Sequence, residues 1–372
     1  MDGLTTRLNK LSIGPRTHIG FADGLPDEVP FCPPVELTSR LHDTPRYLFR
    51  VYSKASAGEN TNECMKSIDA LENNLTDIFA RDDASKTALT LNEHLRWKEK
   101  SYGDPFISWT TSILVAIQYA IYKHKKDPTP LRKIHLCIID TTLFRSGVFM
   151  RDLDLMEEFH DKVPGDHSIV VKDRKHTWKE RGLNDFCHLR KKQHKFYSGV
   201  YYFGEYLSQG QTNIKGRSCT VTCDRIINDH LFSLIPSFKV ELKDPRAYWA
   251  DAVVKFRESF YRTEEPASTN GSEFEGAVMI ALQYGKMWFL PILANLLAMR
   301  PRMPRDFGIL LRILDLFSDE LIRSLSSEDT KVVANKNIPE VLAFRNIVCD
   351  IRRYYYAECA DASVRSMKDA TN

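Results

Sequence analysis

Three polar residues stand inside apolar and aromatic runs of the sequence: Arg50, Ser108 and Glu205. Burying such groups is costly unless a partner satisfies them, and one cleft that took all three would do so. An arginine can hold a phosphate or a ribose, and a serine can orient the arginine or the glutamate. A glutamate can bind a ribose and stabilise cationic charge. This combination of groups suits chemistry on NAD.

The segments around these residues are typical of β-strands. Aromatic and β-branched residues are frequent in Tyr47–Ser53 and Phe106–Ser112, and a third strand is expected to begin near Glu205. Strand alternation places Thr110 on the same face as Ser108, two residues away.

Apolar spacing predicts the neighbouring elements. Helices are expected over Cys64–Phe79 and Ile113–Tyr122, and a buried strand over Ile134–Asp140. Thr111 and Ser112 are suitable caps for the second helix.

In order and spacing, these segments resemble the ADP-ribosyltransferases of the cholera and pertussis toxin type. That family carries an arginine on a first strand, a Ser-Thr-Ser strand, and a catalytic glutamate that opens a later strand. Arg50, Ser108 and Glu205 occupy the matching positions, and Thr110 takes the place of the last serine. The same blocks resemble a family of fungal proteins of unassigned function. The resemblance covers roughly residues 40–245.

The resemblance implies an α+β fold, with an ADP-ribosyltransferase-like split β-sandwich and flanking helices. It implies NAD as the substrate, cleaved at the nicotinamide–ribose bond, with ADP-ribose passed to a macromolecule, such as a protein acceptor, or to water. Arg50, Ser108 and Glu205 would be catalytic. Arg50, Ser108 and Thr110 would also bind NAD, and Tyr202 is an aromatic candidate for stacking on it.

The sequence departs from the toxin pattern at three positions, of which Trp109 and Phe203 favour an alternative. Tyr52 stands where the toxins carry an aspartate, and Trp109 replaces the middle threonine. Phe203 lies two residues before Glu205, where many members carry a glutamate or glutamine that receives the target group. An arginine acceptor therefore cannot be inferred. The alternative is a catalytically silent binding module whose helical C-terminal half is the interaction surface.

The sequence predicts three parts. Residues 1–40, interrupted by glycines and prolines, are expected to form an irregular arm. Residues 41–245 would form the domain that contains the whole cleft. Residues 246–372 read as an all-helical module without catalytic residues, after a flexible linker at Glu264–Ser272.

Composition indicates a globular intracellular protein, cytoplasmic or nuclear. The chain has 372 residues, 43% of them hydrophobic, and a net charge of only +3. Eight scattered cysteines suit a reducing compartment better than a disulfide scaffold. A signal peptide is not evident, and the apolar window Met287–Met299 is shorter than the ~20 residues of a spanning helix.

Other partners have weaker signals. Residues 172–195 are the most basic part of the chain, which fits either a surface for nucleic acid or phosphate or an ordinary solvated face. The pair Cys219 and Cys223 would lie about 13 Å apart on a strand, so no metal site is expected.

Overall fold

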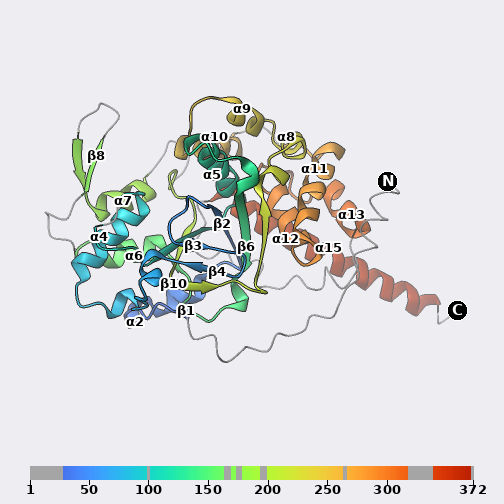
Figure 1. Ribbon diagram of the computed structural model, residues 1–372. Coiled ribbons are helices and arrows are strands. Elements are labelled where there is room, and N and C mark those ends of the chain that lie inside the picture. Colours follow the sequence, from blue (N-terminus) through green and yellow to red (C-terminus); the bar gives the residue numbers. More distant parts are fainter. Residues whose placement is uncertain are drawn as a thin grey trace.

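The computed structural model describes residues 28–98, 101–162, 169–172, 178–192, 199–262, 266–316 and 338–369. A curled antiparallel sheet of nine strands lies at the centre, with helices on both sides (Figure 1). The expected mixture of strands and helices, with a mostly helical C-terminal part, is confirmed.

The sheet is built from segments spread over most of the N-terminal two-thirds of the chain. Its strands are β1 (Glu28–Val29), β2 (Tyr47–Ser53), β3 (Glu59–Asn60), β4 (Cys64–Lys66), β5 (Phe106–Thr110), β6 (Ile134–Asp140), β7 (Met150–Arg151), β10 (Glu205–Asn213) and β11 (Ser218–Thr222). Their order is β11-β6-β2-β5-β10-β4-β3, and β1 and β7 also pair with β10. A separate ribbon pairs β8 (Ile169–Lys172) with β9 (Trp178–Arg181).

Helices cover both sides of the sheet. In the N-terminal part they are α2 (Val35–Thr38), α3 (Ile68–Leu71), α4 (Ala84–Leu95), α5 (Ile113–Lys126), α6 (Asp152–Phe159), α7 (Leu183–Lys191), α8 (Asp229–Leu234) and α9 (Ser237–Lys243). Further along the chain they are α10 (Ala250–Arg257), α11 (Gly271–Ala281), α12 (Lys286–Leu297), α13 (Phe307–Leu316) and α15 (Pro339–Asp369). Figure 1 shows α4, α6 and α7 on one side of the sheet and α11, α12, α13 and α15 on the other.

The register of three neighbouring strands brings the predicted site residues together. β5 lies between β2 and β10, and all of these pairings are antiparallel. Ser108 pairs with Leu207, and Glu205 pairs with Thr110. Phe49, next to Arg50, also pairs with Thr110. The strands that carry the arginine, the serine and the glutamate are therefore adjacent.

Helix α5 follows the serine strand and packs against the sheet. The Ser112 side chain accepts a hydrogen bond from the Val115 N–H and caps its first turn. Leu114, Ile117 and Ile121 are almost fully buried, as apolar residues three or four apart on one helix face should be. This packing fixes the end of β5 beside the cavity described below.

The expected domain boundary at Pro245 does not separate two cores. One apolar cluster contains Phe49 of β2, Ile117 of α5 and Ile138 of β6 together with Leu293 of α12 and Phe344 of α15. Because the sheet and the C-terminal helices share these contacts, the two expected domains form one packed unit.

A buried ion pair of the C-terminal part also contacts the N-terminal part. Arg257 and Glu340, 0% and 3% exposed at the side chain, approach to 2.7 Å. Glu340 also accepts a hydrogen bond from the Ser112 hydroxyl at 2.6 Å. Arg257 donates to the carbonyl oxygen of Tyr202 at 2.6 Å. The C-terminal part therefore supports both the cap of α5 and the segment that leads to Glu205.

Two local expectations are wrong. Residues 1–27 lie outside the described residues, but Glu28–Val29 forms β1 and Phe31 is 2% exposed, so residues 28–40 are not an irregular arm. Cys64–Phe79 is not one helix. It begins as β4, whose partner is β10, and then makes the single turn of α3. Its apolar residues do not share one buried helix face, because Met65 is buried in β4 whereas Leu71 and Leu75 are exposed.

The expected linker is shorter than Glu264–Ser272. Asn270 and Glu273 form a capping box that starts α11 at Gly271. The Thr269 N–H, just before this box, donates to Asp306 at the start of α13.

Among the described residues, no helix is both long and apolar enough to cross a membrane.

Candidate active site

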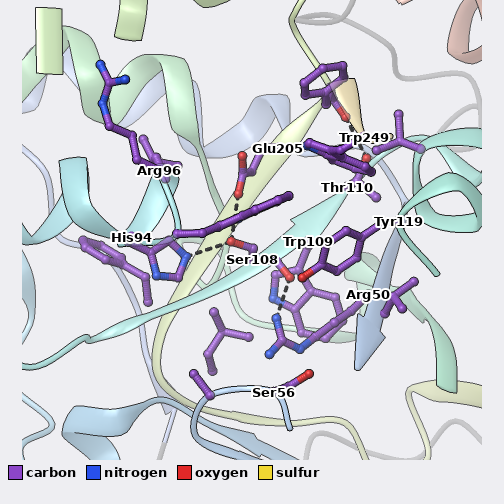
Figure 2. Close-up of a pocket in the computed structure, with 18 of the residues that line it drawn as sticks. Arg50, Ser56, His94, Arg96, Ser108, Trp109, Thr110, Tyr119, Glu205 and Trp249 are labelled. Atoms are coloured by element: carbon purple, nitrogen blue, oxygen red, sulfur yellow. Dashed lines mark hydrogen bonds between the residues drawn. The ribbon is translucent and has the colours of Figure 1, made fainter. Parts of the chain in front are cut away.

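A cavity of about 610 Å³ opens where β2, β5 and β10 meet α4, α5 and α7. Four of the predicted site residues line it: Arg50, Ser108, Thr110 and Glu205. Figure 2 shows Arg50 and Glu205 on opposite sides of Ser108. The structure thus brings the arginine, the serine and the glutamate to one cleft.

Ser108 and Glu205 are in direct contact. The Ser108 Oγ donates to Glu205 Oε1 at 2.8 Å (Figure 2). The second oxygen, Oε2, accepts from Arg190 Nη2 at 2.6 Å. The Glu205 side chain is 14% exposed. A mostly buried carboxylate is therefore held at the cavity by two donors.

The residue before Glu205 must be a glycine. Gly204 has a φ of +67°, and a Cβ there would lie 2.1 Å from the Thr111 hydroxyl oxygen. Its carbonyl accepts from the Thr111 N–H at 2.9 Å. This close approach sets the register in which Glu205 starts β10 opposite Thr110.

Arg50 approaches the backbone of Ser108, not its hydroxyl. Its Nη1 donates to the Ser108 carbonyl at 2.8 Å, and Nε and Nη2 donate to Asn60 Oδ1 at 3.1 and 2.8 Å. These bonds to described residues use three of the five guanidinium N–H groups, so donors are left for a ligand. Burial lowers the pKa of Arg50, with smaller opposing effects from neighbours such as Tyr119.

A histidine and an aspartate extend the contact between Ser108 and Glu205. His94 of α4 places Nε2 2.7 Å from the Ser108 Oγ (Figure 2). Its Nδ1 lies 2.9 and 2.8 Å from the two carboxylate oxygens of Asp104. Asp104 is 3% exposed and also accepts from the Phe106 N–H. The result is a chain Asp104–His94–Ser108–Glu205.

Arg190 is a further residue that the sequence reasoning missed, after His94 and Asp104. It lies in the basic stretch 172–195, yet its side chain is only 5% exposed. Its guanidinium carbon lies 4.9 and 5.1 Å from the ring centres of Phe186 and Phe203, and Nη1 donates to the Tyr201 carbonyl at 3.0 Å. The basic stretch is therefore not uniformly a solvated face. Its other residues at 173–177 and 193–195 lie outside the described residues.

A buried aspartate lies behind Arg190. The Asp152 carboxylate is 3.7 Å from the Arg190 Nε and is fully buried. Burial raises the pKa of Asp152 to about 7, with Glu205 adding to the rise and Arg190 opposing it. Arg190 thus stands between two carboxylates, one at the cavity and one behind it.

Two of the missed residues had a signal in the helix pattern. Arg190 continues the spacing of Leu183, Phe186 and Cys187 on the inner face of α7. His94 lies beside Leu91 and Leu95 on α4. A charged or polar residue on such an apolar face indicates a buried partner.

The predictions for Thr110 and Tyr202 have different outcomes. The Thr110 hydroxyl donates to the Phe203 carbonyl at 2.7 Å and lines the cavity. Tyr202 does not reach the cavity. Its side chain, 3% exposed, packs in a second core cluster with residues such as Leu207. Its neighbours Tyr201 and Phe203 line the cavity, because side chains alternate in this extended segment.

An aromatic wall closes the cavity on the side of α5. The rings of Trp97, Tyr119 and Trp249 lie 5.1 to 5.5 Å from one another, and Phe203 lies 5.4 Å from Trp249. Trp97 has a φ of +54° and is 47% exposed, which is an unfavourable state for a large residue. The sequence predicted that the whole cavity would lie within residues 41–245. This is wrong, because Trp249 lies after Pro245.

Basic residues outnumber acidic ones around the cavity. Two carboxylates line it, Asp104 and Glu205, and the basic lining residues are Arg50, Lys66, Arg96, Lys98, Lys123 and Arg190. This balance favours an anionic ligand. Among the described residues, no group of three or more His, Cys, Asp or Glu is placed to hold a metal ion.

Comparison with known proteins gives one match. Residues 43–211 match a family described as Domain of unknown function (DUF7587). Searches of curated proteins and of solved structures found no match. The matched range contains the four hydrogen-bonded residues Asp104, His94, Ser108 and Glu205. It also contains Arg50 and Arg190, whereas Trp249 lies beyond it.

Proposed function

We propose that this protein cleaves NAD at the bond between nicotinamide and ribose. The observation that carries the proposal is the contact between Ser108 and Glu205 at a cavity that Arg50 also lines. The resemblance to the ADP-ribosyltransferases requires these three residues to converge, on strands in this order. The fold that the proposal implies is therefore an ADP-ribosyltransferase-like one.

Each residue has a role in the proposed reaction. Arg50 would hold the diphosphate or ribose through its remaining N–H groups, aided by the basic lining. The aromatic wall of Trp97, Tyr119 and Trp249 offers faces for the planar rings of NAD. Ser108 orients the Glu205 carboxylate and carries no negative charge itself.

Glu205 would act on the bond that breaks. The bond between the ribose carbon and the nicotinamide nitrogen breaks, and its electron pair moves to the nitrogen, which neutralises the pyridinium. The ribose carbon is left cationic, and a nearby carboxylate stabilises that charge. Because Arg190 offsets part of the charge of Glu205, we expect slow turnover.

The Asp104–His94–Ser108 contacts favour a second reading, in which Ser108 is an activated nucleophile. The position of Glu205 opposes it. A carboxylate oxygen 2.8 Å from the serine Oγ would repel the negative charge that such a nucleophile develops. We therefore assign the histidine and the aspartate to positioning Ser108 and Glu205.

A catalytically silent module is the alternative from another class. Both oxygens of Glu205 are already hydrogen-bonded, and Phe203 offers no polar group to a target. One experiment on the full chain distinguishes the two proposals. Calorimetry with NAD measures binding, and chromatography measures released nicotinamide. Binding with nicotinamide release supports the enzyme, whereas binding without any release supports the silent module.

A further inference from the structure

Arg190 constrains what can react beside Glu205. Its guanidinium is 2.6 Å from Glu205 Oε2 and is clamped between Phe186 and Phe203. If Glu205 stabilises a cationic ribose carbon, as the proposed function requires, the attacking group must arrive close to the same carboxylate. It therefore arrives close to a fixed positive charge.

Among the described residues that line the cavity, a cationic acceptor would find no carboxylate without donors already bound to it. Of the two that line the cavity, Glu205 is held by Ser108 and Arg190, and Asp104 is held by His94 and the Phe106 N–H. An amine or guanidinium must lose a proton before it attacks, and a positioned base such as a histidine or a carboxylate takes it. His94, which also lines the cavity, is held between Asp104 and Ser108.

The Asp152 carboxylate lies on the far side of Arg190 and is fully buried, so it does not face the cavity. The rings of Phe203 and Trp249 also line the cavity. Like charges brought together without compensation strongly disfavour a partner.

We infer that the acceptor of this site is water, and that the protein is an NAD glycohydrolase and not an arginine-directed transferase. The inference rests on the proposed NAD cleavage. Water adds its oxygen to the cationic ribose carbon and gives up one proton to the solvent. NAD and water thus become nicotinamide, ADP-ribose and one proton.

The test uses the full chain with NAD and with agmatine, a small guanidinium nucleophile. Nicotinamide is quantified by chromatography, and free ADP-ribose and ADP-ribosyl-agmatine are quantified by mass spectrometry. We expect free ADP-ribose to exceed the adduct by at least about tenfold, because of the charge repulsion. A predominance of the adduct would overturn the inference alone. No nicotinamide release under any condition would overturn the proposed function and this inference with it.

The variant Arg190→Gln tests whether the positive charge of Arg190 causes the preference for water. Glutamine can still donate to Glu205 but lacks the charge, so the share of adduct should rise by about tenfold. The control Arg225→Gln removes an exposed arginine that does not line the cavity. It should leave the share of adduct unchanged. An unchanged share in folded Arg190→Gln, or an equal rise in both variants, would contradict the role given to Arg190. Should Arg190→Gln not fold, the wild-type product ratio decides.

Discussion

The hydroxyl of Ser108 and the carboxylate of Glu205 lie 2.8 Å apart, although 97 positions separate them in the chain. The contact exists because β5 and β10 pair antiparallel, with Glu205 opposite Thr110. Gly204 permits this register, and the register brings the Ser108 hydroxyl within hydrogen-bond distance of Glu205. A carboxylate is thus held at the wall of a cavity that basic residues surround.

Replacing Ser108 by alanine should slow nicotinamide release without unfolding the protein. The change removes one hydrogen bond to Glu205 and the oxygen that faces His94. A hydrogen bond to a charged group contributes about 1.5–3 kcal/mol, so we expect a loss of about tenfold to a hundredfold. Ser233→Ala, on the exposed side of α8, is the matched control. Equal rates for Ser108→Ala and the control would remove Ser108 from the site.

Replacing Arg50 by lysine should weaken NAD binding by about tenfold or more, because an ammonium cannot reproduce the planar fork of a guanidinium. Calorimetry on folded protein measures the effect. Arg46→Lys is the control just before the same strand, since Arg46 pairs with Asp140 and does not line the cavity. An unchanged affinity in Arg50→Lys would make Arg50 a structural residue that supports Asn60 and β5.

The sequence was most informative where local composition matches the environment. Tyr47–Ser53 and Ile134–Asp140 were predicted as strands and are strands with those bounds, since they lie in the middle of the sheet and are buried on both faces. Helix α5 and the C-terminal helices followed from apolar spacing and clear caps. Arg50, Ser108 and Glu205 could be selected because polar groups inside such runs need partners.

The rest depended on contacts between distant segments. Within Cys64–Phe79, the strand Cys64–Lys66 pairs with β10, and no local pattern reveals that pairing. Pro245 marks a change in composition, but Glu340 reaches across it to Ser112, and Arg257 reaches across it to the Tyr202 carbonyl. His94 and Arg190 lie on apolar helix faces, which indicates buried partners, but only the fold identifies those partners as Ser108 and Glu205.

Removing Glu340 should destabilise the whole protein and not only its C-terminal part. In Glu340→Ala the fully buried Arg257 loses its partner, and breaking a buried pair in this way costs about 3–5 kcal/mol. Chemical denaturation measures the free energy of unfolding. The control Glu63→Ala breaks an exposed pair with Lys215 and should cost less than about 1 kcal/mol. A separate early transition in Glu340→Ala, with the sheet unaffected, would restore the expected boundary at Pro245.

The stability of the protein should depend on pH through Asp152. Burial raises the pKa of this carboxyl from 3.8 to about 7, so the folded state holds its proton more tightly than the unfolded state. The stability from this proton is complete below pH 3.8 and is lost as the pH rises to about 7. Asp152→Asn cannot titrate.

The stability of wild type relative to Asp152→Asn should therefore fall as the pH rises from about 4 to 7, by up to about 4 kcal/mol. Parallel thermal melts of the two proteins across this range measure the difference. A constant difference, or one that grows with pH, would show that burial does not dominate at Asp152.

Nicotinamide release by wild type and by Glu205→Gln is the most direct test of the central claim. Glutamine keeps the shape of Glu205 and still accepts hydrogen bonds from Ser108 and Arg190, but it lacks the negative charge. We expect slow, measurable release by wild type and by the exposed control Glu63→Gln, and a loss of about a hundredfold or more in Glu205→Gln. Circular dichroism confirms that all three are folded. Equal release by Glu205→Gln and wild type, or none by wild type, would contradict NAD cleavage at this site.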